Sequence, residues 1–183
     1  MQSATGGKLS TAELTKMSMC VALCCASAYI IFPLPFTPAP VTAITLTMSL
    51  AAYILKPKQT FMVILIYILI GAAGLPVFAG GTSGIGKLFG PTGGFILVWL
   101  IAYPILSAVK GDDVSFKRYA IANILTAIPL SYVGGLISMY LVMEITLAQA
   151  FTMAVLPFIL GDIMKALAAA FLGVKLNSIH TSL

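Results

Sequence analysis

The stretch GLPVFAGGTSGIGKLFGPTGG, from Gly74 to Gly94, decides how the rest of the chain is interpreted. It holds eight glycines, two prolines and three hydroxyl side chains in 21 residues, and apolar runs flank it on both sides. Irregular backbone with unpaired N–H and C=O groups is not tolerated in contact with lipid. We therefore expect this segment at a membrane surface, packed on other protein or around a polar cavity. Its large apolar side chains indicate a loop that folds back as the wall or lid of a binding site: Leu75, Val77, Phe78, Leu88 and Phe89.

Composition indicates a single domain, residues 1–183, of an all-α integral membrane protein. Hydrophobic residues make up 60% of the chain and charged residues 8%, with a mean hydropathy of +1.08. A soluble domain carries about 25% charged residues. The formal net charge of +5 does not indicate a nucleic-acid partner, because the basic residues stand singly or in pairs between apolar runs.

Apolar segments predict six transmembrane helices, each approaching the ~20 residues that a span needs. The first is interpreted as an uncleaved span and not as a signal peptide. The second is short for a full span, and the proline-rich stretch PLPFTPAP separates it from the first. The expected helices cover residues 12–32, 41–55, 59–73, 94–109, 119–143 and 147–176.

Positive charge predicts the orientation, because cytoplasmic loops are rich in lysine and arginine. Eight of the ten basic residues fall on one side of the predicted spans, whereas the opposite loops hold only Lys87 and the acidic Glu144. Both termini are therefore expected in the cytoplasm, and the glycine-rich loop between the third and fourth helices is expected outside. The eight residues are Lys8, Lys16, Lys56, Lys58, Lys110, Lys117, Arg118 and Lys175.

Asp162 and Lys165 are the two clearly ionisable residues well inside a predicted span. Their spacing of three residues puts them on one helix face. A charged group at this depth costs at least about 2.5–3.5 kcal/mol, so it usually serves a function and faces the bundle interior. One interpretation is that both residues line a ligand cavity open to the outside. The alternative is an ion pair that only holds helices together.

The segment GTSGIGKL, from Gly81 to Leu88, imitates a phosphate-binding loop. Its last position should be Ser or Thr to hold magnesium, and here it is Leu88. No strand is predicted before it, and the predicted orientation puts it outside the cell. We expect no nucleotide site here.

A stripe of small residues, Ser18, Ala22 and Ala26, recurs every four positions along the first helix. Such stripes allow close helix approach in lipid. Spacing alone favours packing within this bundle, as it does for Gly134, Gly135 and Ser138, and leaves a partner interface open for the first helix. Asn123 is interpreted as a structural hydrogen-bonding residue.

The residues that could act as nucleophiles, bases or metal ligands do not form a pattern typical of an enzyme. The cysteines, Cys20, Cys24 and Cys25, are interpreted as small packing residues, and the single histidine, His180, is in the tail. No catalytic residues, metal ligands or cofactor are expected, and binding and transport are favoured over catalysis.

The chain resembles BioY, the family of biotin-specific membrane subunits (S-components) of energy-coupling factor transporters. The resemblance covers nearly the whole length and rests on four motifs, of which the second and third are the most specific. The family usually has Gln at the position of Ile44, which puts one ligand contact in doubt. The motifs are PFTPAPVT (35–42), GAAGLPVFAGG (71–81), GPTGG (90–94) and GDIMK (161–165).

The resemblance implies a multi-pass protein of the bacterial cell membrane that binds biotin from outside with high affinity. Implied partners are a membrane coupling protein and two cytoplasmic ABC-type ATPases, which would drive uptake. The Ala-x-x-x-Ala docking stripe of the family maps onto Ala22 and Ala26, and this favours a partner interface. Two alternatives stay open: an S-component or solitary facilitator for another small vitamin, and a membrane enzyme with an unrecognised site.

Biotin offers two ureido N–H donors, one C=O, an apolar bicycle and a carboxylate tail. Asp162 suits the donors and Lys165 an oxygen, although the sequence does not divide this pair between head group and tail. Aromatic rings at Phe36, Phe78 and Phe89 are expected to cover the apolar body. Further hydrogen bonds are expected from Thr82, Ser83, Thr92, Gly80 and Gly81 in the glycine-rich loop.

Overall fold

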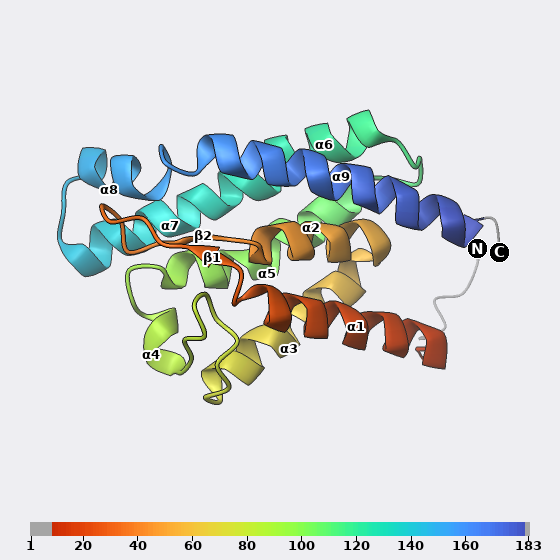
Figure 1. Ribbon diagram of the computed structural model, residues 1–183, viewed down its shortest axis with the longest axis horizontal. Coiled ribbons are helices and arrows are strands. Elements are labelled where there is room, and N and C mark those ends of the chain that lie inside the picture. Colours follow the sequence, from red (N-terminus) through yellow and green to blue (C-terminus); the bar gives the residue numbers. More distant parts are fainter. Residues whose placement is uncertain (1–8, 182–183) are drawn as a thin grey trace, which may run out of the picture.

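A computed structural model describes residues 9–181 of the chain, and side chains as far as residue 178. Within this range the chain is mostly helical, and most of its helices run along the long axis of the molecule (Figure 1). The elements, in order, are α1 (Thr11–Ser27), β1 (Ile31–Phe32), β2 (Val41–Thr42), α2 (Ile44–Ile54), α3 (Pro57–Ala72), α4 (Ile85–Leu88), α5 (Gly93–Val109), α6 (Phe116–Leu125), α7 (Ala127–Met143), α8 (Leu147–Ala154) and α9 (Ile159–Thr181).

Helix α5 is central and packs against α2, α3 and α7. Its approach to α7 depends on glycine, because a Cβ at Gly134 would collide with the backbone of Gly94. The ring of Phe95 occupies the space that a side chain at Gly135 would need, and Ser138 donates to the carbonyl of Pro91. The prediction that this small-residue group packs within the bundle is confirmed.

Two predicted continuous helices are each divided in two. The expected helix 119–143 is α6 and α7, separated at Thr126, and the expected helix 147–176 is α8 and α9, which are bent by 42°. A proline lies near each break, Pro129 in the first turn of α7 and Pro157 between α8 and α9. Pro129 cannot donate to the carbonyl of Leu125, and Pro157 cannot donate to that of Met153.

The carbonyl of Met153, left without its helical donor, accepts a hydrogen bond of 2.9 Å from the hydroxyl of Thr37. Thr37 belongs to the loop of the β1–β2 hairpin, in which Ile31 pairs with Thr42 and Phe32 with Val41. The bend between α8 and α9 thus holds the hairpin in place.

The first two helices are shorter than predicted, because residues expected at the end of the first and at the start of the second form the strands of the hairpin. Phe32 precedes a proline, which disfavours helical geometry, and it is in a strand. Helix α1 therefore ends at Ser27 and not near Phe32, and α2 begins at Ile44 and not at Val41.

The glycine-rich loop folds back onto the bundle, as predicted. Phe78 is fully buried and pairs with Thr82 in an isolated β-bridge. The Tyr67 hydroxyl donates to the carbonyl of Val77, which is also buried. Leu88 packs partly against the core, but Leu75 and Phe89 are exposed and do not pack as expected.

Among the described residues, length and hydropathy single out one segment that could cross a membrane alone, namely α6 and α7 taken together, Phe116–Met143 with 28 residues. The bent pair α8 and α9 could form a second span. The apolar helices α2, α3 and α5 have 11, 16 and 17 residues and are shorter than a full span. Six spans therefore stay a prediction.

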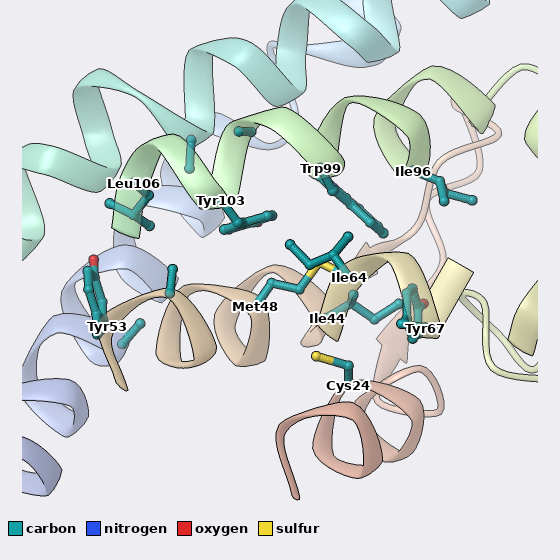
Figure 2. Packing of buried hydrophobic residues seen from close by; sticks show 14 of the residues in the cluster. Cys24, Ile44, Met48, Tyr53, Ile64, Tyr67, Ile96, Trp99, Tyr103 and Leu106 are labelled. Atoms are coloured by element: carbon teal, nitrogen blue, oxygen red, sulfur yellow. The ribbon is translucent and has the colours of Figure 1, made fainter. Parts of the chain in front are cut away.

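The main hydrophobic core lies between α2, α3 and α5. Figure 2 shows Ile96, Trp99 and Tyr103 of α5 on one side of this core, facing residues of α2 and α3. Cys24 reaches it from α1. The described cysteines are free, with Cys20 and Cys24 buried, which confirms their interpretation as packing residues.

The molecule has two different ends (Figure 1). The terminal end is where α1 begins, α9 ends and the α2–α3 and α5–α6 connections lie. The loop end carries the β1–β2 hairpin, α4 and α8. Seven of the eight basic residues assigned to one side lie in terminal-end segments, and Lys8 lies outside the described residues.

Candidate functional site

A cavity at the loop end has about 690 Å³ of space free of protein atoms, part of it open to solvent. The hairpin, the glycine-rich loop and helices α2, α3, α4, α5, α7 and α9 contribute to its wall. Most of the surface is apolar, with polar groups concentrated on α9 and its neighbours. The lining residues are Ala39, Pro40, Thr42, Thr45, Tyr67, Ala79, Lys87, Thr92, Phe95, Ile96, Trp99, Ser131, Tyr132, Phe158, Asp162 and Lys165.

Asp162 and Lys165 form an ion pair within this wall, with 2.5 Å between Oδ1 and Nζ. Their side chains are 13% and 18% exposed, respectively. Asp162 stands in the first turn of α9, just after the bend at Pro157. The bend therefore sets the direction in which the carboxylate enters the cavity.

The two partners differ in their remaining hydrogen-bonding capacity. A lysine ammonium has three donors. Those of Lys165 are all used, by Asp162, by the carbonyl of Thr42 at 3.2 Å and by Oγ1 of Thr45 at 2.8 Å. Asp162 accepts one further bond, at 2.7 Å from the hydroxyl of Tyr132. A carboxylate has about four acceptor positions, so Asp162 retains room for a ligand donor.

Two buried polar atoms of the cavity wall have no hydrogen-bond partner within the described part of the chain. They are Nε1 of Trp99 and Oγ of Ser131, and both residues are 6% exposed. An unsatisfied buried donor costs about 1–3 kcal/mol. Both atoms are therefore suited to bind an acceptor that a ligand brings into the cavity.

A smaller polar chamber adjoins the cavity at the ion pair. Thr45, Ser131, Asp162 and Lys165 line both spaces. On its far wall the amide of Asn123 donates to Oγ of Ser49 at 2.9 Å. The interpretation of Asn123 as a structural hydrogen-bonding residue is confirmed.

Three of the ten predicted ligand residues, Asp162, Lys165 and Thr92, line the cavity. The other seven lie elsewhere. Phe78 is in the core, whereas Phe36 and Phe89 are 57% and 72% exposed. Ser83 is exposed, and the hydroxyl of Thr82 donates to the carbonyl of Ala79. The backbone N–H groups of Gly80 and Gly81 donate to the carbonyls of Ala28 and Phe78.

The BioY family model matches residues 1–181 of this sequence. The chain belongs to the BioY family. Its relatives include "Probable biotin transporter BioY" of Bacillus subtilis, 38% identical over 79% of this chain and 78% of that one. "Biotin transporter BioY2" of Lactococcus lactis is 36% identical over 85% of this chain and 87% of that one.

The fold of this BioY protein is similar to that of a crystal structure described as the S-component for biotin from an ECF-type ABC transporter. The TM-score is 0.85, with 93% of this chain and 95% of that chain covered. Sequence identity is 21%, so this likeness concerns the fold.

The structure of this BioY protein adds cavity residues that the sequence did not single out, among them Lys87, Trp99, Ser131 and Tyr132. Lys87 had one signal, as the isolated basic residue of the predicted outer loops. Trp99 is the only tryptophan of the chain. Ser131 and Tyr132 look like ordinary residues of an apolar helix until α7 and α9 are brought together.

Ile44, the position at which the resemblance led us to expect Gln, is fully buried in the main core. Figure 2 shows it among the core residues Met48, Ile64 and Tyr67. It does not line the cavity. An apolar residue suits this environment, so the departure from the family pattern is accommodated by packing.

The small-residue stripe of α1 faces outward. Ser18, Ala22 and Ala26 are all exposed, whereas Met17, Cys20 and Cys24 on another face of the helix are buried. Packing within this bundle, which spacing alone favoured, is therefore wrong for this stripe. Its surface is available for another protein or for lipid.

Proposed function

We propose that this BioY protein is the biotin-binding membrane subunit of an ECF-type vitamin transporter. It takes biotin from outside the cell for ATP-driven uptake and catalyses no reaction itself. The observation that carries the proposal is the loop-end cavity, whose apolar wall holds a carboxylate with spare acceptor capacity and two donors that have no partner in the described part of the chain. Family membership and the names of the relatives support biotin as the ligand.

The polar groups of the cavity are of the kinds that the head group of biotin requires. Asp162 would accept the ureido N–H groups, and Trp99 Nε1 and Ser131 Oγ would donate to the ureido C=O. Lys165 would hold Asp162 ionised and in place. The apolar bicycle would lie against the aromatic and aliphatic wall, as small-molecule sites generally combine a few polar groups with apolar surface.

The proposed orientation in the membrane uses the difference between the terminal end and the loop end. We assign six spans, with the terminal end and its basic residues in the cytoplasm and the loop end outside. The loop-end cavity would then open to the side from which the vitamin comes. With this topology the protein would be a multi-pass subunit of the cell membrane.

Mass spectrometry of small molecules extracted from the detergent-purified protein tests the function directly. We expect biotin to co-purify and to rebind in titration calorimetry after its removal. Thiamine and riboflavin serve as competitors that should not displace it. A folded protein that binds another vitamin and not biotin would redirect the proposal to that vitamin.

The exposed stripe of α1 is assigned to the coupling protein, which with two ATPases would complete the transporter. Ala22→Trp should retain biotin binding but lose co-purification with the coupling protein, because a large side chain prevents close helix approach. Leu23→Trp is the control, since Leu23 is equally outward-facing, 53% exposed, and already large. Loss of biotin binding in Ala22→Trp would contradict this assignment.

A further inference from the structure

Lys87 is the third charged residue of the cavity wall, and neither the ion pair nor the head-group site uses it. We propose that its ammonium binds the carboxylate tail of the ligand, at the glycine-rich-loop side of the cavity. Lys87 would thereby select monocarboxylates over ligands with a neutral tail. This inference rests on the proposed function, because it extends the biotin site by a second anchoring point.

The charge balance of the cavity supports this assignment. Its charged lining residues are Lys87, Asp162 and Lys165, giving a formal charge of +1. Asp162 already neutralises Lys165. A ligand with one negative charge therefore makes the occupied cavity neutral, which matters because an uncompensated charge is costly where water is displaced.

Lys165 is poorly suited to receive that carboxylate. All its donors are used, by Asp162, Thr42 and Thr45, and a ligand would have to break one of these bonds. Bonding to the ligand carboxylate would also bring that charge close to Asp162. Like charges at such proximity disfavour each other.

Lys87 has the complementary properties. It is half-buried and lines the cavity, and its side-chain ammonium makes no hydrogen bond or ion pair with any residue of the described chain. Its ammonium is therefore available without breaking an existing interaction. Charge-assisted hydrogen bonds of this kind are about twice as strong as neutral ones.

The loop fixes where Lys87 lies. Gly84, immediately before α4, has φ of 93°, a conformation that favours glycine, and its N–H donates to the carbonyl of Gly71 at 2.8 Å. Leu88, immediately after Lys87, packs against the core. The lysine is thus held between two anchored positions.

Lys87 and Asp162 border the cavity from separate parts of the fold. Helix α4 packs against α3 and α5, whereas α9 packs against α2 and α6. Figure 1 shows α4 and α9 on different sides of the bundle. Two polar anchors separated in this way suit an elongated ligand with a hydrogen-bonding head and an anionic tail.

Titration calorimetry with biotin and biotin amide tests the proposal, because the two differ only at the end of the tail, where biotin has a carboxylate and the amide has a neutral group. Wild-type protein should bind biotin at least about tenfold more tightly than the amide. Lys87→Gln should weaken biotin binding by about the same factor and leave amide binding unchanged. Lys87→Arg should keep the preference for biotin.

The matched control is Lys58→Gln, which removes an exposed lysine at the terminal end and should change neither affinity. If Lys87→Gln still prefers biotin over the amide to the wild-type extent, Lys87 does not bind the tail and the inference is wrong. Equal losses for both ligands would also contradict it, since they indicate a general distortion. A folded wild-type protein that binds neither ligand would refute the proposed function and this inference together.

Discussion

Each end of the bundle holds a partly buried lysine between helices, and the two lysines have different surroundings. At the loop end, Lys165 pairs with Asp162 beside a cavity in which two donors have no partner among residues 9–178. At the terminal end, Lys110 donates to the carbonyls of Tyr53 and Leu55, where α2 ends. Asn177 adds a bond to the Tyr53 carbonyl at 3.0 Å.

Polar groups at the terminal end form hydrogen bonds with one another and join the helix ends. Asn177 also donates to the hydroxyl of Tyr119, and the rings of Tyr53 and Tyr119 stack with centroids 4.5 Å apart. Carbonyls at the end of a helix need such partners. A polar cluster that satisfies itself stabilises the fold, whereas one that leaves donors unpaired next to a cavity is prepared for a ligand.

The comparison between the two ends assumes that the loop end faces the outside of the cell. Cysteine labelling tests this orientation, and the expected difference in labelling is the largest effect among these predictions. After Cys20, Cys24 and Cys25 are replaced, Ser83→Cys at the loop end should react fully with an impermeant thiol reagent in intact cells. Ser115→Cys at the terminal end should not react until the membrane is permeabilised. The reverse pattern would overturn the orientation.

Asp162 variants should show the next largest effect. Asp162→Ala and Asp162→Asn should each weaken biotin binding at least about tenfold, since ~1.4 kcal/mol corresponds to a factor of ten. The ligand N–H groups would lose their acceptor and Lys165 its counter-ion. Lys165→Ala should weaken binding comparably.

The double variant Asp162→Asn, Lys165→Met separates binding from mere stapling of helices. A pair that only holds helices together should regain both stability and biotin affinity when both charges are removed. We expect titration calorimetry to show no recovery of affinity. Near-native affinity in the double variant would contradict the proposed role of the pair.

Asn177→Ala should behave in the opposite way at the terminal end. Loss of its bonds to Tyr53 and Tyr119 should lower the free energy of unfolding by about 1–3 kcal/mol. Biotin affinity should be unchanged. Thermal unfolding and calorimetry on the same preparation measure both, and a selective loss of affinity would refute the contrast between the two ends.

Ser131→Ala should have a smaller effect, and, unlike Asn177→Ala, it should change biotin affinity without lowering stability. Removal of a donor that has no partner among the residues that the structure describes should not lower the stability of the ligand-free protein, and should slightly raise it. Biotin binding should weaken by about fivefold, corresponding to ~1 kcal/mol. Unchanged affinity would show that this hydroxyl does not meet the ligand.

Lys110 should add a modest pH dependence that is specific to the terminal end. Lys110 lies one residue beyond α5, and burial lowers its pKa from 10.5 to about 8. Because the unfolded chain binds this proton more tightly, the stability of the folded state should rise between about pH 8 and 10.5. Comparison of thermal unfolding with Lys110→Met isolates this contribution, and parallel pH profiles would contradict it.

Local patterns in the sequence predict some features of the fold and the site but do not predict others. The charge pair was visible because ionisable residues are costly in an apolar span. The glycine-rich loop was visible because its backbone cannot span lipid. Both are properties of one segment that need no knowledge of its neighbours.

Features that depend on tertiary contacts were not visible. The partners of Lys165 and Asp162, such as Thr45 and Tyr132, come from helices distant in the sequence. The helix breaks near Pro129 and Pro157 have a local signal in these prolines, but the apolar composition around them obscures it. Aromatic residues near the motifs were expected in the site, whereas Phe78 is in the core and Trp99 is at the cavity.

The hydrogen bond from Thr37 to Met153 has a consequence for how the protein is made. It joins residues 116 positions apart, and the bond from Lys165 to the Thr42 carbonyl joins residues 123 apart. Domains fold during synthesis from the N-terminal side, so the hairpin is made long before α8 and α9 can hold it. The pocket is therefore assembled last, and vitamin binding reports that the newest helices have reached their places.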